Sequence, residues 1–426
     1  MHRDIINKFF FALLTLLPVS IIIGPAASLV NILIFDFFFI VLLIINRNFD
    51  WIKSSIIKIL LILYFYLIFN SFISLDPSSG LLRNLGFIRL IIFFIGLNYF
   101  LQDKKFHKIF YFWSIVILIT IFDIFFERIN GFNILGFTSE NQRRIASFFV
   151  DELIVGGFVY AFIFMLIGFY LDKYKNEKLF IKNFLLSLIV ITLLSVLLTG
   201  ERSNSIKFIL SLLIFLSLID FITLKKKIFF LISLIFIFFI TIISNDYVKS
   251  RMYYSLKHSA STFVSSFEHG QPWDNPKGNL YAKLYRSGYD IFKKYPYFGV
   301  GNKNYRIESC NNNFYQANIH KLRSDQVCMT HPHQLYFEFL SEHGLIGTLI
   351  ILCIFFMIFI QSMRKIIFEK NYIGYGCLSY LLVIFTPILP SGAFFTDYNI
   401  TLLMLNLSVL YGCSKNLNIF NNYKSF

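Results

Sequence analysis

Long apolar runs separated by polar segments dominate the chain. The runs are longer than β-strands and lack the alternation of apolar and polar positions found in transmembrane barrels. Because a helix of about 20 apolar residues crosses the hydrocarbon core of a bilayer, the pattern predicts an all-α, polytopic membrane protein. About twelve transmembrane helices are expected, at residues 9–23, 29–46, 55–74, 85–101, 107–126, 153–171, 183–199, 206–223, 228–244, 335–360, 374–390 and 399–413.

Composition and charge agree with a membrane location. Hydrophobic residues make up 57% of the 426 residues, and the mean hydropathy is +0.66, far above that of soluble domains. Lys and Arg are concentrated in alternate short loops, whereas the loops near 24–28 and 389–398 contain none. This bias predicts that the N- and C-termini are both cytoplasmic. It also accounts for much of the net charge of +15, so nucleic-acid binding is not needed to explain that charge.

One connection is much longer than the others. Residues 245–333 form a polar segment on the outer side of the membrane, with twelve Lys/Arg, six Asp/Glu and many aromatic residues. A loop of this length is usually functional or disordered, and its aromatic content argues against disorder. The spacing of apolar residues within 279–294 predicts a helix on the bundle surface, which Pro296 would end.

Two of the five cysteines, Cys310 and Cys328, fall in this outer segment. An oxidising outer compartment would allow a disulfide between them. The alternative is a pair of free thiols. We expect the disulfide.

Three ionisable residues are candidates for chemistry. Arg202 follows the seventh apolar run, on the side where short loops avoid Arg, and Arg286 lies on the predicted loop helix. His333 precedes an expected helix N-terminus, where the helix dipole disfavours imidazolium and leaves a neutral ring able to accept a proton. Taken singly, each has an ordinary explanation: a snorkelling arginine, a solvated arginine and a structural histidine.

A metal site is a competing interpretation of the histidines. His331 and His333 are two residues apart, and His320 and His343 would be further ligands. Pro332 restricts how the two rings converge, and the chain contains no established metal-binding motif. We therefore expect no metal.

The motif around His333 resembles a known family. His333-Gln334, then nine residues, Gly344, two residues and Gly347 is similar to the histidine motif of bacterial O-antigen ligases and O-antigen polymerases. In this family the residue after the histidine is more often Asn than Gln. If the helix is continuous, the two glycines lie on the face below the histidine and allow close helix packing. If it breaks at Gly344, they mark a hinge.

The resemblance extends to other segments. TGERSN resembles the family's arginine at the outer end of a span, which would be Arg202. The pattern R…P…GxG resembles its second arginine, which would be Arg286, and residues 142–158 look like its outer loop before the sixth span.

Family membership implies a polytopic glycosyltransferase of GT-C-like fold that uses a glycan linked to undecaprenyl diphosphate. Transmembrane helices 1–9 would occupy 1–244, a large periplasmic loop with catalytic residues 245–333, and transmembrane helices 10–12 with the cytoplasmic C-terminus 334–426. The protein would lie in the bacterial inner membrane with its active site facing the periplasm.

The resemblance also implies residue roles. His333 would act as general base, and Arg202 and Arg286 would bind the diphosphate, without a metal or cofactor. The transfer would be a direct displacement with inversion. Further candidates for orienting the histidine or binding substrate are Arg144, Asp151, Glu152, His331, Glu338 and Glu342.

Three functions remain open at this point. An O-antigen ligase transfers the glycan to lipid A-core, whereas a polymerase transfers it to a lipid-linked repeat unit. The helix count and the single large outer loop favour the ligase. A polysaccharide flippase or transporter is a weaker alternative, because the chain shows no clear repeat and most of its apolar runs carry no charge.

Overall fold

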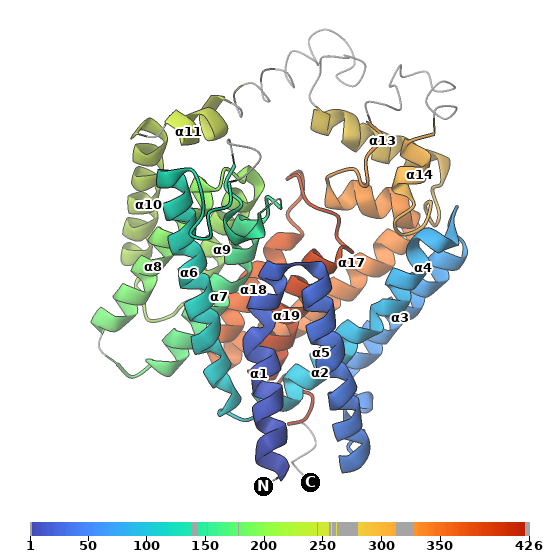
Figure 1. The fold of residues 1–426 in the computed structure, drawn as a ribbon, viewed down its shortest axis with the longest axis horizontal. Helices are drawn as coiled ribbons and strands as arrows, with labels where there is room; N and C mark the ends of the chain where they lie inside the picture. The colour runs from blue at the N-terminus through green and yellow to red at the C-terminus, as the bar shows by residue number, and fades with distance from the viewer. Residues whose placement is uncertain are drawn as a thin grey trace.

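A computed structural model describes residues 2–138, 144–150, 152–177, 179–244, 246–254, 257, 261, 280–311 and 327–421. Figure 1 shows a bundle of helices, and no strand occurs among the described residues. The α-helices are α1 (His2–Ile23), α2 (Pro25–Asn46), α3 (Ser55–Phe72), α4 (Pro77–Gly86), α5 (Ile88–Leu101), α6 (Ile109–Asn130), α7 (Val155–Lys173), α8 (Leu179–Leu198), α9 (Arg202–Leu218), α10 (Leu224–Ser244), α11 (Asp246–Val248), α13 (Leu280–Lys294), α14 (Tyr305–Ser309), α17 (Leu335–Glu369), α18 (Tyr372–Ile384) and α19 (Asp397–Gly412). Short 3-10 turns occupy Asp50–Lys53, Phe106–Lys108 and Ser147–Phe149, and a π-helical turn occupies Lys249–Tyr254.

Every predicted apolar span coincides with a helix. In the described part of the chain, nine helical segments are long and apolar enough to cross a membrane, which makes this a multi-pass membrane protein. The other three expected spans correspond to α9, α18 and α19, which have 17, 13 and 16 residues. A full crossing typically takes about 20 residues, with a lower limit of about 17, so α18 and α19 are shorter than that range and α9 lies at its lower limit.

The centre of the bundle is formed by α7, which is almost entirely buried and packs along α18. Two glycines allow this close contact. A Cβ at Gly168 would overlap the backbone of Tyr372, and a Cβ at Gly376 would overlap the backbone of Phe164. Small residues that let helix backbones approach are typical of packing inside membranes.

Helix α17 is sharply kinked at Gly344, which has φ 62° and ψ −168°. The kink leaves backbone N–H groups of α17 without a partner inside the helix. Carbonyl oxygens of the loop at 296–298 accept these groups instead: Leu345 N donates to Pro296 O (2.8 Å) and Ile346 N to Tyr297 O (3.1 Å). Of the two arrangements that the sequence left open, the structure therefore has the break.

The ends of the bundle differ. Both termini lie at one end, and α11, α13 and α14 cover the other (Figure 1). The predicted loop helix is observed as α13, and α13 and α14 enclose a small hydrophobic cluster with the segment before α17. This cluster contains Leu284, Ile291, Val300, Tyr305 and Val327 and is separate from the main core of the bundle.

Candidate active site

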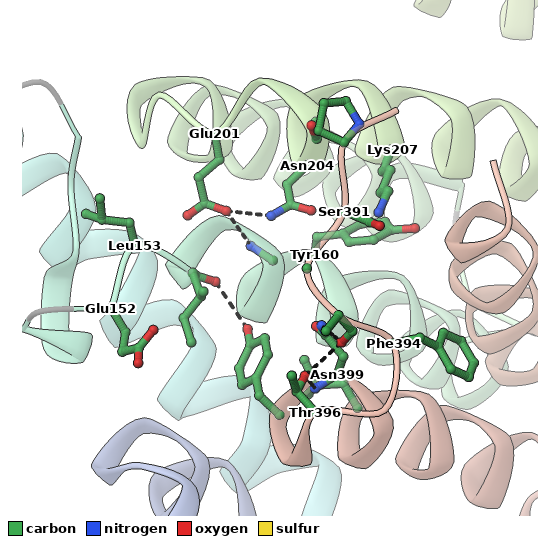
Figure 2. A pocket seen from close by; sticks show the side chains of 18 of the residues that line it. Glu152, Leu153, Tyr160, Glu201, Asn204, Lys207, Ser391, Phe394, Thr396 and Asn399 are labelled. Carbon is green, nitrogen blue, oxygen red and sulfur yellow. Dashed lines mark hydrogen bonds between the residues drawn. The ribbon is translucent and has the colours of Figure 1, made fainter. Parts of the chain in front are cut away.

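A cavity of about 1210 Å³ lies between α9, α13, the segment before α17 and the start of α19. Figure 2 shows its wall from close by. Glu201, at the start of α9, and Asn204 and Lys207 of the same helix point into it from one side. Thr396 and Asn399, at the start of α19, face them from the other side.

His331 and His333 both line this cavity, and their ring centroids are 4.0 Å apart. The backbone of His333 has φ 56°, in the left-handed region that side chains other than glycine seldom adopt. Ser391 holds this conformation, because its N–H donates to the carbonyl oxygen of His333 (2.9 Å). The helix then begins at Leu335, with Gln334 as its N-cap, whose side-chain oxygen accepts the N–H of Phe337 (2.9 Å).

Both rings interact with the carbonyl oxygen of Ser391, and His331 has a second partner. His331 Nε2 lies 3.3 Å from the carbonyl oxygen of Ser391, to which it donates, and its Nδ1 lies 3.0 Å from Thr330 Oγ1. A neutral imidazole satisfies both contacts, with Nδ1 accepting the Thr330 hydroxyl proton. Since both nitrogens of His331 are engaged, His333 is the better proton acceptor of the pair.

Both imidazoles favour the neutral form. Burial lowers the pKa of His331 to about 3, with a further contribution from the neighbouring His333. Burial also lowers the pKa of His333, although the Ser391 carbonyl acts in the opposite direction. A neutral His333 is able to accept a proton at neutral pH.

Three arginines gather on the cavity wall beside α9. They are Arg144, Arg202 at the first position of α9, and Arg251 in the π-helical turn. Burial lowers the pKa of Arg251, and the charges of Arg202 and Arg144 lower it further. The guanidiniums are therefore close enough to repel one another, and an anion between them would relieve the repulsion.

Two of these guanidiniums have incompletely satisfied donors. One terminal nitrogen of Arg144 donates to the carbonyl oxygen of Leu153 (2.8 Å), and one of Arg251 to that of Gly200 (3.3 Å). The Nε atoms of both are buried without a hydrogen-bond partner in the described part of the structure. Buried donors normally have a partner, so the site fits an anionic ligand with several acceptor oxygens.

Glu201 belongs to the framework that positions this arginine cluster. Its carboxylate accepts the N–H groups of Gly156 (2.8 Å) and Gly157 (3.2 Å) at the start of α7, and the side-chain amide of Asn204 (2.5 Å). Figure 2 shows two of these bonds as dashed lines. Glu201 thus ties the start of α9, next to Arg202, to the N-terminus of α7, where a carboxylate is favoured by the helix dipole.

Arg286 is not among the residues that line the cavity, although Tyr281, Ala282 and Tyr285 of the same helix are. Its Nε lies 3.1 Å from a carboxylate oxygen of Asp290, one turn further along α13. Arg251, which no sequence motif singles out, does line the cavity. The GxG that follows Arg286 has a packing role, because a Cβ at either of its glycines, Gly299 or Gly301, would overlap the backbone of α17 or the side chain of Ser74.

The carboxylates singled out in the sequence have different surroundings. Glu152 lines the cavity and is exposed, whereas Asp151 lies outside the described residues. Glu338 and Glu342 are buried and bond to the backbone, Glu338 accepting the N–H of Phe394 (2.9 Å). Glu342 accepts the N–H of Tyr305 (3.4 Å). Neither lines the cavity, so both are better explained as anchors of α17 than as sugar ligands.

Cys310 and Cys328 form a disulfide. It links the end of α14 to the segment that leads to His331. His320, considered above as a metal ligand, lies outside the described residues. Among the described residues, no three His, Cys, Asp or Glu side chains are grouped in a way that would hold a metal ion.

Three further residues line the cavity although the sequence did not single them out: Arg251, Ser391 and Lys207. Arg251 lies far from any motif, and its position depends on how the turn after α10 packs against α9. Ser391 acts mainly through its backbone, which carries no residue-type signal. Lys207 was detectable, because it is a lysine inside an otherwise apolar run.

Part of the chain is similar to a known protein family. Residues 187–352 match the family model described as O-antigen ligase. The matched segment runs from α8 into α17 and contains Arg202, Arg251, His331 and His333. A search of curated proteins finds no match.

Proposed function

We propose that this chain, whose residues 187–352 match the family model described as O-antigen ligase, is an inverting membrane glycosyltransferase. It transfers a glycan from undecaprenyl diphosphate to a sugar hydroxyl of lipid A-core. The observation that carries the proposal is the presence of a histidine pair and a cluster of three arginines beside α9 on the wall of one cavity. That combination suits a reaction with a proton to remove and an anionic leaving group to stabilise.

The arginines stabilise the leaving group. A guanidinium stays charged and forms paired hydrogen bonds with phosphate oxygens. Arg144, Arg202 and Arg251 together offset the charge that develops on the diphosphate as its bond to the sugar breaks. No acid is then needed to protonate the leaving group.

His333 activates the acceptor. Its free ring nitrogen accepts the proton of the acceptor hydroxyl while that oxygen attacks the anomeric carbon. The bond from the anomeric carbon to the diphosphate oxygen breaks as the new glycosidic bond forms, so configuration inverts and no covalent enzyme intermediate arises. His331 orients the imidazole of His333 by packing against it. Ser391 fixes the backbone of His333.

The arrangement of charge suggests how the protein lies in the membrane. We place α11, α13, α14 and the cavity on the periplasmic side of the bacterial inner membrane, and both termini in the cytoplasm. The division into 1–244, 245–333 and 334–426 follows from this placement. The lysine- and arginine-rich short loops then face the cytoplasm, as the positive-inside rule requires.

The test is reconstitution of the purified protein with lipid-linked glycan and one of two acceptors. Transfer to lipid A-core supports a ligase, and transfer only to a second lipid-linked unit supports a polymerase with the same donor chemistry. A deletion strain separates the two independently: loss of a ligase leaves bare core, and loss of a polymerase leaves core with one unit. Failure to transfer to either acceptor refutes the proposal.

A further inference from the structure

Lys207 is a charged residue in the cavity that the proposed reaction does not use. It lies on α9 five residues after Arg202, which is roughly 7.5 Å further along the helix axis. Its side chain is half-buried and lines the cavity. In Figure 2 it extends from α9 into the cavity on the same side as Asn204.

The ammonium group of Lys207 has no protein partner in the described part of the chain: no hydrogen bond, ion pair or ring contact involves it. The carboxylates that line the same cavity are Glu152, Glu201 and Asp397. Two of them have partners elsewhere, since Glu201 binds the start of α7 and Asp397 binds Arg89 (2.5 Å). Figure 2 shows the third, Glu152, on the opposite side of the cavity from Lys207.

An ammonium that is half-buried on a cavity wall and lacks a counter-charge is unfavourable, which points to an anion supplied by a ligand. The surroundings suit a sugar: Tyr160 and Tyr380 contribute aromatic surface to the wall, and Ser391 contributes a hydroxyl. Ser391 Oγ is buried and, among the described residues, has no hydrogen-bond partner.

We propose that Lys207 binds an anionic oxygen group of the substrate, the carboxylate of an acidic sugar or a phosphate, deeper in the cavity than the arginine cluster. The inference rests on the proposed glycan transfer for the identity of the substrate. It deepens that function by adding a point of substrate selection. Glycans that carry the anion are then bound more tightly than neutral ones.

A binding measurement that does not depend on transfer tests this. The unfolding temperature of the purified protein is followed against the concentration of D-glucuronate, inorganic diphosphate or D-glucose, which gives an apparent Kd for each. In Lys207→Met the Kd of at least one anion rises about tenfold or more, because a charge-assisted hydrogen bond is lost. Lys207→Arg keeps the Kd within a few-fold of the original, and Lys226→Met, at an exposed lysine at the start of α10, leaves it unchanged.

The two probes distinguish the sources of the anion. An effect on glucuronate alone assigns the subsite to an acidic sugar, and an effect on diphosphate alone assigns it to phosphate. Lys207→Gln provides a second neutral variant if Lys207→Met does not fold. The inference is overturned if neither anion binds, if both Kd values are unchanged in the neutral variants, or if glucose responds as the anions do. Absence of transfer by the unmodified protein would refute the proposed function and leave this binding result standing.

Discussion

At the scale of single residues, the backbone conformation of His333 determines the direction in which its side chain points. A left-handed φ of 56° turns the histidine away from the helix direction that follows at Leu335. Such conformations persist only when the surroundings impose them, and here the hydrogen bond from Ser391 does so. The carbonyl oxygen of Ser391 also accepts a hydrogen bond from His331 Nε2. One loop therefore controls the orientation of both rings.

The pH dependence of transfer reports on His333. Because burial lowers its pKa, the base stays neutral at pH values below the usual histidine value of about 6.5. We expect kcat/KM to be constant near neutral pH and to fall as the pH drops through this lowered pKa. His333→Ala should reduce kcat by roughly 10²- to 10⁴-fold and remove that acidic limb.

His107→Ala is the matched control, since His107 binds the Leu101 carbonyl in the turn after α5 and does not line the cavity. It should leave both kcat and the profile unchanged. A His333→Ala protein with the same acidic limb would show that another group accepts the proton.

The sequence and the structure point to different arginines as ligands of the donor diphosphate, and this difference can be tested. Arg251 lines the cavity with an unpartnered buried Nε, as far as the described residues show, whereas Arg286 is ion-paired to Asp290. Arg251→Gln should lower kcat/KM for the lipid-linked donor by roughly 10- to 100-fold, the worth of a hydrogen bond to a charged group. Arg286→Gln should have a smaller effect, transmitted through α13. Steady-state kinetics with varied donor would contradict the assignment if the Arg286 variant were the more impaired.

At the scale of elements, the kink in α17 connects the outer segment to the bundle. Gly344 leaves the helical conformation where the loop at 296–298 inserts. The loop contacts α17 on both sides of the break, because Val300 N donates to Ser341 O (2.9 Å) and Gly301 N to Glu342 O (2.9 Å). The first two turns of α17, which follow His333, are thereby held by the outer loop and not by the membrane helix alone.

Gly344→Ala tests this junction. The substitution forces alanine into a backbone conformation (φ 62°, ψ −168°) that is essentially restricted to glycine, at a cost of about 1–3 kcal/mol. Its Cβ would also clash with the backbone of Tyr297, which adds about 1–3 kcal/mol. Gly131 ends α6 in the ordinary left-handed region (φ 82°, ψ −1°) and has open space around it, so Gly131→Ala should cost only about 1–2 kcal/mol. Equal losses of unfolding free energy in the two variants would show that the inserted loop does not constrain Gly344.

At the scale of the whole molecule, the sequence predicts the helices better than it predicts the site. Apolar runs locate helices because burial in lipid requires them at a fixed length, and even the short α9, α18 and α19 were found this way. His331, His333, Arg144, Arg202 and Glu152 were expected in the site and do line the cavity. Arg251 and Arg286 were not distinguishable, because which arginine reaches the cavity depends on how α13 and the turn after α10 pack. Glu338 and Glu342 were named because they follow His333 closely, and the sequence does not reveal that their carboxylates accept the backbone N–H groups of Phe394 and Tyr305.

Among the described residues there are two hydrophobic clusters, one in the bundle and a small one that involves α13 and α14. Along the chain, His331 and His333 lie between Val327 of the small cluster and Leu335 of the main core. The disulfide between Cys310 and Cys328 closes a loop with a sequence separation of 18 on the side of the small cluster. Closing a loop of that size stabilises the folded state by about 3 kcal/mol, because it lowers the chain entropy of the unfolded state. A cluster of only five buried side chains cannot readily compensate for the loss of this stabilisation. Replacing both cysteines with Ser should thus loosen this cluster and lower kcat, while the bundle keeps its helical content.

Hydrogen exchange followed by mass spectrometry measures this difference. Protection should fall in α13, α14 and residues 327–334 and stay unchanged in α7 and α18, because only the small cluster loses its cross-link. Cys353→Ser, at an exposed free cysteine in α17, serves as the control for the loss of a thiol. If exchange in α7 rose together with exchange in α13, the two clusters would unfold as one unit. The position of His333 would then depend on the bundle itself and not on the disulfide-linked outer segment.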